Sequence, residues 1–583
     1  MDSLLHFNFI KEDKKENPLL FKNPIKVLSA STIEEVIPLL KEVEEETSKG
    51  NYAAGYVSYE AAPAFDQNFK VNENPDMPLL WFGIYEAPEK TTIKSFRDFR
   101  LSEWKAETNI IDYNDSIQQI KNAIEKGITY QVNYTIRLLS QFDGDSIAFY
   151  NQMVNAQAAN YSAYLNIGDY TVISASPELF FHLRKDGVIT TKPMKGTVGR
   201  GKNAQEDDDN SRWLYQSEKN RAENVMIVDL LRNDLGMVAI EGSVKVPSLY
   251  SIEEYPTVYQ MTSTVTAEIS DDKTISDIFK AIFPCGSITG APKISTMNII
   301  NDLESSPRNV YCGAIGYITP EKEAIFNVPI RTVMIDNEKG TAQYGVGGGI
   351  TWDSTEKEEY NEVLTKAKVL DVKPTDFQLL ESLGLEEGHY IVLENHLKRM
   401  QSSAEFFGYR LDMTAVRTSL NDFASQHKEG KWKVRLLSDR NGEHYIEGKE
   451  IKPFTEPVRA ELASEPISKD NVFLHHKTTN RGVYENFMQQ SGVYDVLLWN
   501  EELEITEFTT GNIVVEINDK LYTPPLRSGL LPGTYREDLL DKNILTEKTL
   551  RIDDLAEASK IWLINSVRKW VAVELRTKAE VTV

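Results

Sequence analysis

The stretch YSAYLNIGDYTVISASPELFFHL at residues 161–183 is rich in β-branched and aromatic residues, which favour extended strands. Similar strand-type segments occur at residues 52–61 and 79–87, whereas helical patterns occur at 113–127 and 211–232. These elements do not alternate regularly, as they would in a doubly wound parallel sheet. The first 370 or so residues therefore predict a large α+β unit that mixes many strands with helices.

A change in composition and in the pattern of predicted elements after this region predicts a second module. The Glu- and Lys-rich segment STEKEEYNEVLTKAKVL (354–370) is interpreted as a helix, and Pro374 with its polar neighbours marks a boundary. An amphipathic helical pattern at 394–408 and several short strand-like segments follow. We expect domains at residues 1–372 and 373–583. Two modules with different patterns of predicted elements favour two activities on one chain, although a regulatory second domain would give the same pattern.

The composition is that of an ordinary globular chain of 583 residues, with 41% hydrophobic and 26% charged residues. The 88 acidic and 64 basic residues give a net charge of −24, which repels nucleic acid and anionic lipid. Cys285 and Cys312 are too few for a disulfide framework or a four-cysteine zinc site. Neither a secretory signal nor a long apolar run is found, so we expect a cytoplasmic protein without nucleic-acid or membrane partners.

Several clusters in the first module carry residues suited to chemistry. Lys195 lies in TTKPMKGTVGR, although a lysine in a loop is more often only a solvated charge. The segments FPCGSITGAPK (283–293) and YGVGGGITWDS (344–354) are interpreted as loops whose amide groups approach a ligand without Cβ interference. Glu359 and Glu362 are three residues apart on one helix face, where two carboxylates suit a hard cation such as Mg²⁺.

Together and in this order, the segments of the first module resemble the chorismate-utilising enzyme family. That family includes the large subunits of anthranilate and aminodeoxychorismate synthases and the isochorismate and salicylate synthases. The resemblance covers nearly the whole module and implies a large α/β sandwich. The matching segments are YQVNYTIRL (130–138), SASPELFF (174–181), PMKGT (193–197), ENVMIVDLLRNDLG (223–236), FPCGSITGAPK, YCGAIGY (311–317), IRT (330–332) and GVGGGITWDS with the EEYNE tail.

The resemblance also implies roles for single residues. Chorismate is a dicarboxylate with a ring hydroxyl, and a planar guanidinium suits a carboxylate. The residues implied in substrate binding are Tyr311, Arg331, Thr289 and the amides of Gly347 and Gly348. The residues implied as ligands of Mg²⁺, which neutralises the other carboxylate, are Glu223, Glu359 and Glu362. Glu178 matches the acid that protonates the departing 4-hydroxyl, because hydroxide is a poor leaving group.

Lys195 indicates the subclass within this family. A lysine in this motif is typical of aminodeoxychorismate synthases, whereas anthranilate synthases typically have alanine there. The resemblance implies that the lysine amine adds at C2 as the hydroxyl leaves C4, and that ammonia then displaces the lysine. The amine must be deprotonated to add, so its pKa must be lowered. Gln260 stands where some family members have histidine, and we expect it to be a neutral hydrogen-bond donor.

In the second module, Lys477 follows the segment VFLHH, which we interpret as a strand. On its own, this residue is more often a surface lysine. His475 and His476 are adjacent, so in a strand they point to opposite faces and do not predict a metal site. The segment at 500–517 is interpreted as a hairpin, and the segment TPPLRSGLLPGTYREDLL (523–540) as a turn that enters a helix.

The order of these segments resembles the class IV pyridoxal-phosphate enzymes, which include branched-chain and D-amino-acid aminotransferases and aminodeoxychorismate lyase. The resemblance implies that Lys477 binds the cofactor covalently and that Glu507, in ITEFTTGN, keeps the pyridine nitrogen protonated. The residues implied in phosphate binding are Arg399, Thr509, Thr510 and the amides near Gly511. Arg435 is a candidate for a substrate carboxylate.

The two resemblances predict a bifunctional enzyme that makes 4-aminobenzoate for folate synthesis. The first module would convert chorismate and ammonia to 4-amino-4-deoxychorismate, and the second would eliminate pyruvate from that product. Both cysteines lie in first-module motifs, so we expect ammonia from a separate glutamine amidotransferase subunit. A homodimer through the second module is a further expectation. The alternatives are an anthranilate-, isochorismate- or salicylate-type synthase, and a second module that is an aminotransferase or is not catalytic.

Overall fold

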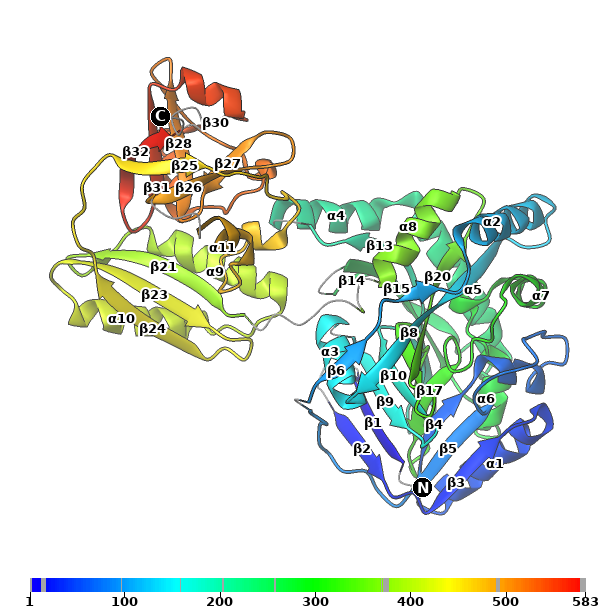
Figure 1. The fold of residues 1–583 in the computed structure, drawn as a ribbon. Helices are drawn as coiled ribbons and strands as arrows, with labels where there is room; N and C mark the ends of the chain where they lie inside the picture. The colour runs from blue at the N-terminus through cyan, green and yellow to red at the C-terminus, as the bar shows by residue number, and fades with distance from the viewer. Residues whose placement is uncertain are drawn as a thin grey trace. The chain divides into compact units, whose positions relative to one another are not determined.

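The computed structural model describes residues 3–11, 17–95, 97–157, 159–201, 204–255, 258–367, 370, 377–488 and 493–576 (Figure 1). The chain divides into two compact units. The first comprises Met1–Gly199 and Asn210–Pro374, and the second comprises Arg200–Asp209 and Thr375–Val583. The predicted boundary between residues 372 and 373 lies outside the described residues.

Two large sheets form the framework of the first unit, with ten strands each among the described residues. The first sheet contains β16 (Gly290–Ala291), β8 (Gln131–Gly144), β20 (Thr341–Ile350), β19 (Thr332–Asp336), β10 (Tyr170–Ser176), β9 (Tyr161–Asn166), β1 (Leu4–Phe9) and β2 (Pro18–Lys22), with β6 (Phe99–Leu101) and β7 (Lys105–Ala106) beside β8. The second contains β13 (Met194–Gly199), β15 (Val258–Glu268), β12 (Val188–Lys192), β11 (Leu179–Leu183), β18 (Ala324–Asn327), β17 (Ala314–Ile318), β4 (Tyr52–Val57), β5 (Leu80–Tyr85) and β3 (Lys26–Ala30), with β14 (Lys245–Glu254) beside β15.

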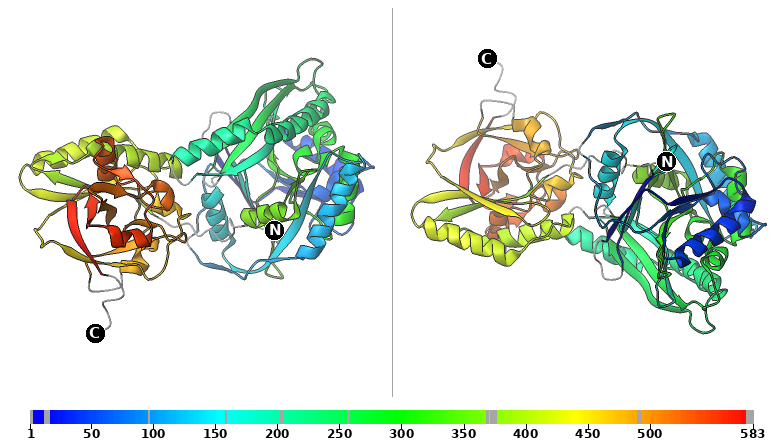
Figure 2. Two further views of the ribbon diagram at one scale, coloured as in Figure 1. Left: turned by 90° about the horizontal axis from the view of Figure 1, so that it is seen from above. Right: turned by 90° about the horizontal axis from the view of Figure 1, so that it is seen from below.

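Helices cover the outer faces of the two sheets (Figure 2). The helices of this unit are α1 (Ile33–Ser48), α2 (Ile110–Glu125), α3 (Ser146–Gln157), α5 (Glu218–Gly236), α6 (Ile275–Ile282), α7 (Lys293–Leu303) and α8 (Glu356–Ala367), with short 3-10 turns η1 (Tyr59–Ala64) and η2 (Gly286–Ile288). The residues of α4 (Ala204–Gln216) are divided between the two units after Asp209. The sheets face each other through a core that includes Phe7, Phe21, Tyr56 and Tyr317. The predicted α/β sandwich is therefore confirmed as a structure of four layers.

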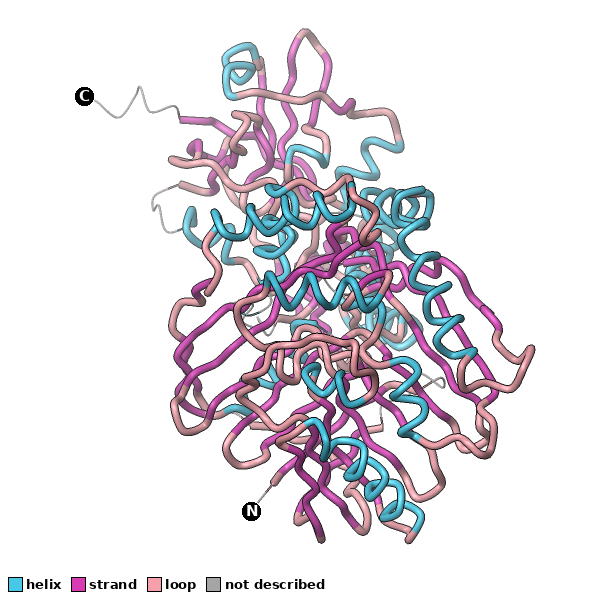
Figure 3. The backbone as a smooth tube through the Cα atoms, turned by 90° about the vertical axis from the view of Figure 1, so that its right-hand side faces the viewer, coloured by secondary structure: helices cyan, strands magenta, loops and turns pink. Residues whose placement is uncertain are grey.

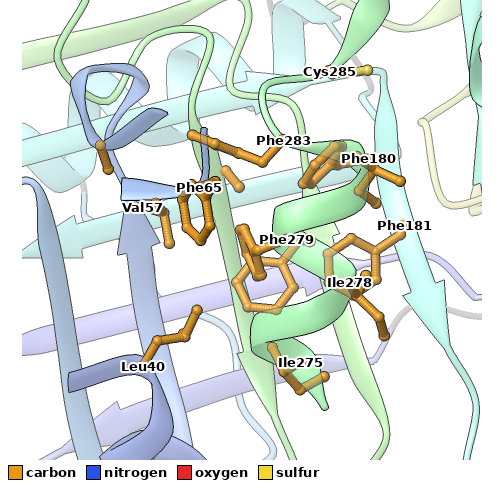
Figure 4. Close-up of a cluster of buried hydrophobic side chains, with 14 of the residues drawn as sticks. Leu40, Val57, Phe65, Phe180, Phe181, Ile275, Ile278, Phe279, Phe283 and Cys285 are labelled. Carbon is orange, nitrogen blue, oxygen red and sulfur yellow. The ribbon is translucent and has the colours of Figure 1, made fainter. Parts of the chain in front are cut away.

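The outer face of the second sheet packs on helices through an aromatic core (Figure 4). Phe279 on α6 lies edge-to-face on Phe181 and Phe326, with ring centroids 5.7 and 5.3 Å apart. The loop that follows α6 carries Phe283 and Cys285 into this core. Such aromatic pairs contribute about 0.5–1.5 kcal/mol beyond their burial. The core thereby anchors the FPCGS segment and the helix α5, which both contribute residues to the candidate site.

The second unit contains a four-stranded sheet and a closed set of strands (Figure 1). Figure 3 distinguishes the helices and strands of the chain by colour. The four-stranded sheet runs β22 (His389–Tyr390), β21 (Leu379–Glu386), β23 (Lys431–Ser438) and β24 (His444–Glu450). The other strands are β27 (Ile505–Phe508), β26 (Asp495–Trp499), β25 (Val458–Leu462), β32 (Lys569–Arg576), β31 (Lys560–Asn565), β28 (Gly511–Ile517), β29 (Lys520–Thr523) and β30 (Thr546–Glu547). Because β27 also pairs with β28, the strands from β27 to β28 close into a ring.

The helices of the second unit are α9 (Leu393–Phe407), α10 (Met413–Gln426), α11 (Gly482–Met488) and α12 (Thr534–Asp541), with 3-10 turns η4 (Val472–Leu474), η5 (Leu526–Ser528) and η6 (Ile552–Glu557). On α9, Leu397, Met400 and Ala404 form one buried face that packs on the four-stranded sheet. This packing fixes the direction in which His396 and Arg399 point. No helix among the described residues is long and apolar enough to cross a membrane.

Two sequence-based assignments of local structure are wrong. The glycine-rich segment of residues 344–350 is not a loop, because it forms the end of strand β20 and pairs with β8 along its whole length. The segment VFLHH is not a strand, because residues 472–474 form the 3-10 turn η4. In both cases the hydrogen bonds of the backbone, which composition does not report, decide the conformation. The predicted hairpin at 500–517 is confirmed by the pairing of β27 with β28.

Candidate functional site

Lys195 lies on strand β13 and reaches the glycine-rich end of β20. A Cβ atom built on Gly349 would lie only 2.6 Å from the Nζ atom of Lys195. Glycine therefore allows the amine to approach the backbone of β20 closely. Beyond Tyr344, the described residues provide no strand that pairs with the second edge of β20, so alternate backbone amides of residues 345–350 face that open edge. The sequence assigned these amides to a loop, whereas they belong to strand β20, and their role toward a ligand stays a prediction.

Gln260 holds the strand of Lys195 in place. Its Nε2 atom donates to the carbonyl oxygen of Gly196 at 3.0 Å, and its Oε1 atom accepts from the Thr197 hydroxyl at 2.9 Å. Gln260 is therefore a hydrogen-bond donor, and both of its bonds fix the PMKGT strand on β15. The left-handed backbone at Gly196, with φ of 93°, sets the bend beside the lysine.

The surroundings of Lys195 favour a neutral amine. Burial is the largest effect and lowers the pKa of Lys195, and the nearby positive charge of Lys366 lowers it further. Glu223, Glu178 and Glu362 act in the opposite direction. The net direction is a lowered pKa, which is the property that a nucleophilic lysine needs.

Glu178 is a buried acid in the same site. Burial raises its pKa to about 7, against hydrogen bonding from Ser287 and the charge of Lys195. Its Oε1 atom is buried and has no hydrogen-bond partner among the described residues. A carboxyl that stays protonated near neutral pH is suited to give a proton to a leaving group. The structure thus brings an amine of lowered pKa and an acid of raised pKa into one site.

The three predicted metal ligands lie in one acidic region. The carboxylates of Glu359 and Glu362 both lie beside Gly348, at 3.3 and 3.4 Å from the position of a built Cβ. Glu223 interacts electrostatically with Glu362, and burial, with this like charge, raises the pKa of Glu223. However, the described residues contain no group of three His, Cys, Asp or Glu side chains placed to hold a metal ion. The residue types fit Mg²⁺, whereas their present arrangement is not a complete set of ligands.

Lys366 occupies part of this acidic region. Its Nζ atom lies 2.6 Å from Glu362 and donates to the carbonyl oxygen of Gly347 at 2.7 Å. Sequence reasoning missed Lys366, although it is four residues after Glu362 on α8 and therefore one turn away on the same face. The lysine supplies a positive charge where the acids crowd.

The other residues predicted to bind the substrate lie in the same unit but are less closely grouped. The ring of Tyr311 is buried against Gly345 of β20. Arg331 is the residue before β19, and its guanidinium donates to the side chain of Gln157. The hydroxyl of Thr289 donates to the carbonyl oxygen of Cys285 at 3.1 Å, so it is already used within the FPCGS segment. Their roles in substrate binding stay predictions.

Gln131 is a polar residue of the site that sequence reasoning did not single out. It is fully buried, and neither its Oε1 nor its Nε2 atom has a hydrogen-bond partner among the described residues. Its amide lies beside Gly349, next to the Lys195 amine. A buried amide without partners is costly, so it marks a place where a polar ligand belongs. The sequence YQVN does not indicate that the side chain of Gln131 lies beside Lys195, because only the packing of β8 against β20 places it there.

A separate cavity of about 730 Å³ in the same unit does not contain these residues. Its lining includes Phe65, Asp234, Phe283 and Lys293, and Asp234 and Lys293 form a buried ion pair of 3.0 Å. The cavity is therefore not the site defined by Lys195 and Glu178.

In the second unit, Lys477 lies in a largely buried position after η4. Its carbonyl oxygen accepts from the backbone N–H of Leu380 on β21 at 3.0 Å, which fixes the lysine beside that strand. Burial, with the positive charges of Arg399 and Arg481, lowers the pKa of Lys477 to about 7. An amine with this pKa is largely available for covalent bonding near neutral pH.

Arg399 belongs to a buried polar cluster on α9. Its guanidinium binds Glu381 through two hydrogen bonds of 2.9 and 2.6 Å, and Glu381 also contacts His396 at 2.6 Å. Burial alone would raise the pKa of Glu381, but the charges of Arg399 and His396 lower it to about 2. The hydroxyls of Ser566 and Thr534 lie 2.9 and 3.1 Å from Nε2 of His396.

This cluster has the chemistry of a phosphate site. Thr534 begins helix α12, whose N-terminal amides favour an anion, and Arg399 adds a guanidinium, which in this structure is paired with Glu381. Sequence reasoning named Arg399 but missed Ser566 and Thr534. The two hydroxyls are far from Arg399 in the chain, so only the fold reveals that they meet.

Glu507 on β27 is the second acid of interest. Its Oε1 atom accepts from the Tyr484 hydroxyl at 2.8 Å and from the backbone N–H of Leu531 at 3.1 Å, and its Oε2 atom accepts from the amide of Asn512 at 3.2 Å. Burial raises the pKa of Glu507 to about 7. The carboxyl is therefore held in a fixed orientation inside the same buried region as Lys477.

The other predicted residues of the second unit already have partners. The hydroxyls of Thr509 and Thr510 both donate to Asp495, the former at 2.6 Å. Asp495 is an acid, so these hydroxyls are not free for a phosphate in this structure. Arg435 forms an ion pair with Glu447 on the neighbouring strand. Their roles toward a phosphate and a substrate stay predictions.

Comparisons with known proteins agree with this division. A family model described as "chorismate binding enzyme" matches residues 6–371, and one described as "Amino-transferase class IV" matches residues 378–575. The chain is 40% identical over 292 residues to "Aminodeoxychorismate synthase component 1" of Salmonella typhimurium, covering 50% of this chain and 62% of that protein. It is 34% identical over 356 residues to the protein of the same name from Bacillus subtilis, covering 54% and 75%.

A solved structure also resembles the first unit. The crystal structure of anthranilate synthase component I from Streptococcus pneumoniae TIGR4 covers 64% of this chain and 92% of its own, with 24% identity and a TM-score of 0.51. At this identity the likeness concerns the fold alone. The chain spans about three fifths of the length of three of the curated relatives it matches.

Proposed function

The chain belongs to the chorismate binding enzyme family, and on that premise we propose that its first module converts chorismate and ammonia to 4-amino-4-deoxychorismate. The second module, which matches the class IV amino-transferase family, then eliminates pyruvate from this product to give 4-aminobenzoate. The product of the first reaction is thus the substrate of the second. The names of the relatives support the first activity.

Lys195 and Glu178 carry the first reaction in this proposal. The neutral amine of Lys195 forms a bond to C2 of chorismate while the C4–oxygen bond breaks, and Glu178 gives its proton to the departing hydroxyl. Ammonia then adds at C4 and the lysine leaves C2 with its electron pair restored. The observation that carries this proposal is the pairing of an amine of lowered pKa with an acid whose pKa is about 7 in one buried site.

We further propose that Mg²⁺ binds among Glu223, Glu359 and Glu362. Burial and mutual repulsion raise the pKa of Glu223 and Glu359, and a divalent cation would relieve this crowding of negative charge. Lys366 would have to leave Glu362 for the carboxylate to become a ligand. The ion would supply a charge that balances a substrate carboxylate.

Pyridoxal phosphate is the cofactor that the second module's family implies. When bound, it supplies an aldehyde that takes up amines and a ring that withdraws electrons. The residues present fit it: Lys477 offers a neutral amine, Glu507 a buried carboxyl, and Arg399 with Ser566 and Thr534 a phosphate-binding set. In this site the amine of Lys477 would move protons while the enolpyruvyl ether is expelled.

Ammonia is proposed to come from a separate glutamine amidotransferase subunit. The relatives carry the designation "component 1", and both cysteines of this chain are buried, with pKa values raised by burial to about 12 for Cys285 and about 11 for Cys312. A buried thiol with a high pKa is a poor nucleophile for glutamine hydrolysis. Turnover of glutamine by this chain alone would contradict the proposal.

The deciding experiment is incubation of the full chain with chorismate, ammonium, Mg²⁺ and pyridoxal phosphate, with mass spectrometry of the aromatic product. We expect 4-aminobenzoate and pyruvate in equal amounts. 2-Aminobenzoate would establish an anthranilate-type synthase, and salicylate would establish a salicylate-type synthase. Accumulation of 4-amino-4-deoxychorismate without 4-aminobenzoate would refute the proposed role of the second module.

A further inference from the structure

Two lysines face each other across neighbouring strands of the four-stranded sheet in the second unit. Lys433 on β23 is directly opposite Lys449 on β24. Val434 and Leu436, which alternate with Lys433, are buried against α9 and α10, so Lys433 lies on the other face of the sheet. Like charges placed directly opposite each other destabilise a strand pair. Their presence therefore calls for a reason other than stability.

Arg481 and Arg568 add to this positive charge. Loss of water around the ammonium group, followed by the charges of Arg435, Arg481, Lys449 and Arg568, lowers the pKa of Lys433. Arg481 donates to the carbonyl oxygen of Thr509 at 2.7 Å, and Arg568 donates to the carbonyl oxygen of Lys452 at 2.8 Å. We call Lys433, Lys449, Arg481 and Arg568 the basic row.

The basic row has no acidic partners. None of its four members forms an ion pair with any residue that the structure describes. In contrast, Arg435, two residues after Lys433 on β23, is paired with Glu447. The chain as a whole is acidic, with 88 acidic and 64 basic residues. A concentration of unpaired cations in such a chain is the chemistry of a binding site for an anion.

The basic row adjoins the site of Lys477. Gly384 is opposite Lys433 in the sheet, and a Cβ atom on Gly384 would clash with the carbonyl oxygen of Ser566. Ser566 is the residue that contacts His396 in the phosphate-type cluster. Arg481, a member of the basic row, also lowers the pKa of Lys477. The row therefore adjoins the region of Lys477 through Arg481 and through the contact of Gly384 with Ser566, while the side chains of Lys433 and Lys449 are exposed.

We propose that the basic row binds the ring carboxylate of a cyclic amino acid whose amine lies para to that carboxylate. This inference rests on the proposed function of the second module. The amine has to reach the reacting position beside Lys477, and the six-membered ring then separates the carboxylate from it. An α-amino acid, the usual substrate of an aminotransferase, carries its carboxylate one carbon from the amine. Cations set back from Lys477 thus select the para arrangement.

The test measures binding of 4-aminobenzoate to the full chain loaded with pyridoxal phosphate. The variants are Lys433→Gln and Lys449→Gln, with Lys431→Gln as the matched control, since Lys431 lies on the same strand and pairs with Glu386. We expect the dissociation constant to rise about tenfold in each of the first two and to stay unchanged in the control. Aniline, which lacks the carboxylate, should bind all four proteins equally weakly.

Stability gives an independent readout. Removing one of two opposed lysines should leave the melting temperature unchanged or raise it, so loss of binding will not reflect unfolding. Lys433→Glu, which can pair with Lys449, should abolish binding of 4-aminobenzoate while the fold persists. Unchanged binding in both glutamine variants would overturn the inference. A weakened affinity for pyridoxal phosphate itself would also overturn it, because the row would then serve the cofactor.

The test of the basic row can fail or succeed separately from the test of the proposed function. If chorismate yields no 4-aminobenzoate in the wild-type chain, the proposed function fails, whereas selective loss of 4-aminobenzoate binding in the variants would still establish the carboxylate site. If 4-aminobenzoate is formed but its binding is insensitive to the lysines, only the present inference fails.

Discussion

The two sites of the chain each contain a buried lysine of lowered pKa, but their charged surroundings are opposite. Lys195 has Glu223, Glu178 and Glu362 near it, and burial has to outweigh these acids. Lys477 has Arg399 and Arg481 near it, and these cations act in the same direction as burial and bring the pKa to about 7. In both sites burial favours the neutral form of the amine. The charged neighbours differ, because the acids of the first site are proposed to hold Mg²⁺ and the cations of the second site adjoin a proposed phosphate.

The two lysines also differ in how the backbone holds them. Lys195 lies in strand β13, whose position is fixed by the side chain of Gln260. Lys477 lies outside any strand, after a 3-10 turn, and is fixed by a backbone hydrogen bond to Leu380. A covalent lysine therefore does not require one type of element. It requires a backbone that is anchored within one or two residues of the reacting side chain.

The strongest test of this comparison removes each amine in turn. Lys195→Ala should abolish formation of 4-amino-4-deoxychorismate and leave the elimination reaction on added intermediate intact, because each lysine serves only one step. Lys477→Ala should do the reverse and remove the absorbance of covalently bound pyridoxal phosphate. Product analysis by mass spectrometry distinguishes the two losses. Loss of both activities in either variant would show that the sites are not independent.

The acid of the first site gives the next largest effect. Glu178→Gln should slow the first reaction about 10²–10⁴-fold, the range expected for loss of a general acid. With a pKa of about 7, Glu178 is protonated below neutral pH, so the wild-type rate should fall as the pH rises through about 7. The variant should lack this fall. A pH profile of the first reaction with the same midpoint in both proteins would rule out Glu178 as the acid.

Close approach of backbone and amine gives a third test. Gly349→Ala places a methyl group about 2.2 Å from the Nε2 atom of Gln131 and about 2.6 Å from the Nζ atom of Lys195, which forces both side chains to move. A displacement of this size should lower the rate of the first reaction roughly 10²-fold, with the second reaction unaffected. Gly199→Ala at the end of β13 is the matched control, because a Cβ atom there meets nothing within 4 Å. Equal effects of both substitutions would contradict the proposed contact.

The smallest effect concerns the cations beside Lys477. Arg481→Gln removes a positive charge that disfavours the protonated amine, so the pKa of Lys477 should rise. The amine is then neutral only at higher pH, and the rate at which the cofactor-free chain takes up pyridoxal phosphate should shift to higher pH. Arg399→Gln is less informative, because Arg399 also binds Glu381. No shift with Arg481→Gln would show that burial alone sets this pKa.

The sequence predicted the α+β fold class and the two-module organisation from strand-type residues and motif order. It did not predict that residues 344–350 are a strand, because glycine is usually a mark of turns and its ladder with β8 depends on a distant segment. The hairpin of β27 and β28 could be predicted from the sequence, because the two paired strands are adjacent in the chain.

The prediction of the sites divides in the same way. Lys195, Glu178, Lys477 and Glu507 were named from short motifs, and the structure buries all four at least in part. Gln131 and Ser566 were missed because nothing in their immediate sequence marks them, and Lys366 was missed although it lies four residues after Glu362. Each gains its place only from a contact with a residue of another element, as with Gly349, Gly347 and His396.

The amino-acid sequence by itself determined which chemical groups are available and in what order they occur: an amine and an acid in each module. Only the tertiary structure decided which charges surround each amine and how far it is removed from water. These two quantities set the pKa of a lysine, and they depend on segments far apart in the chain; Ser566 and His396, for example, are 170 residues apart. The identity of a reactive residue is therefore local information, whereas its reactivity is a property of the fold.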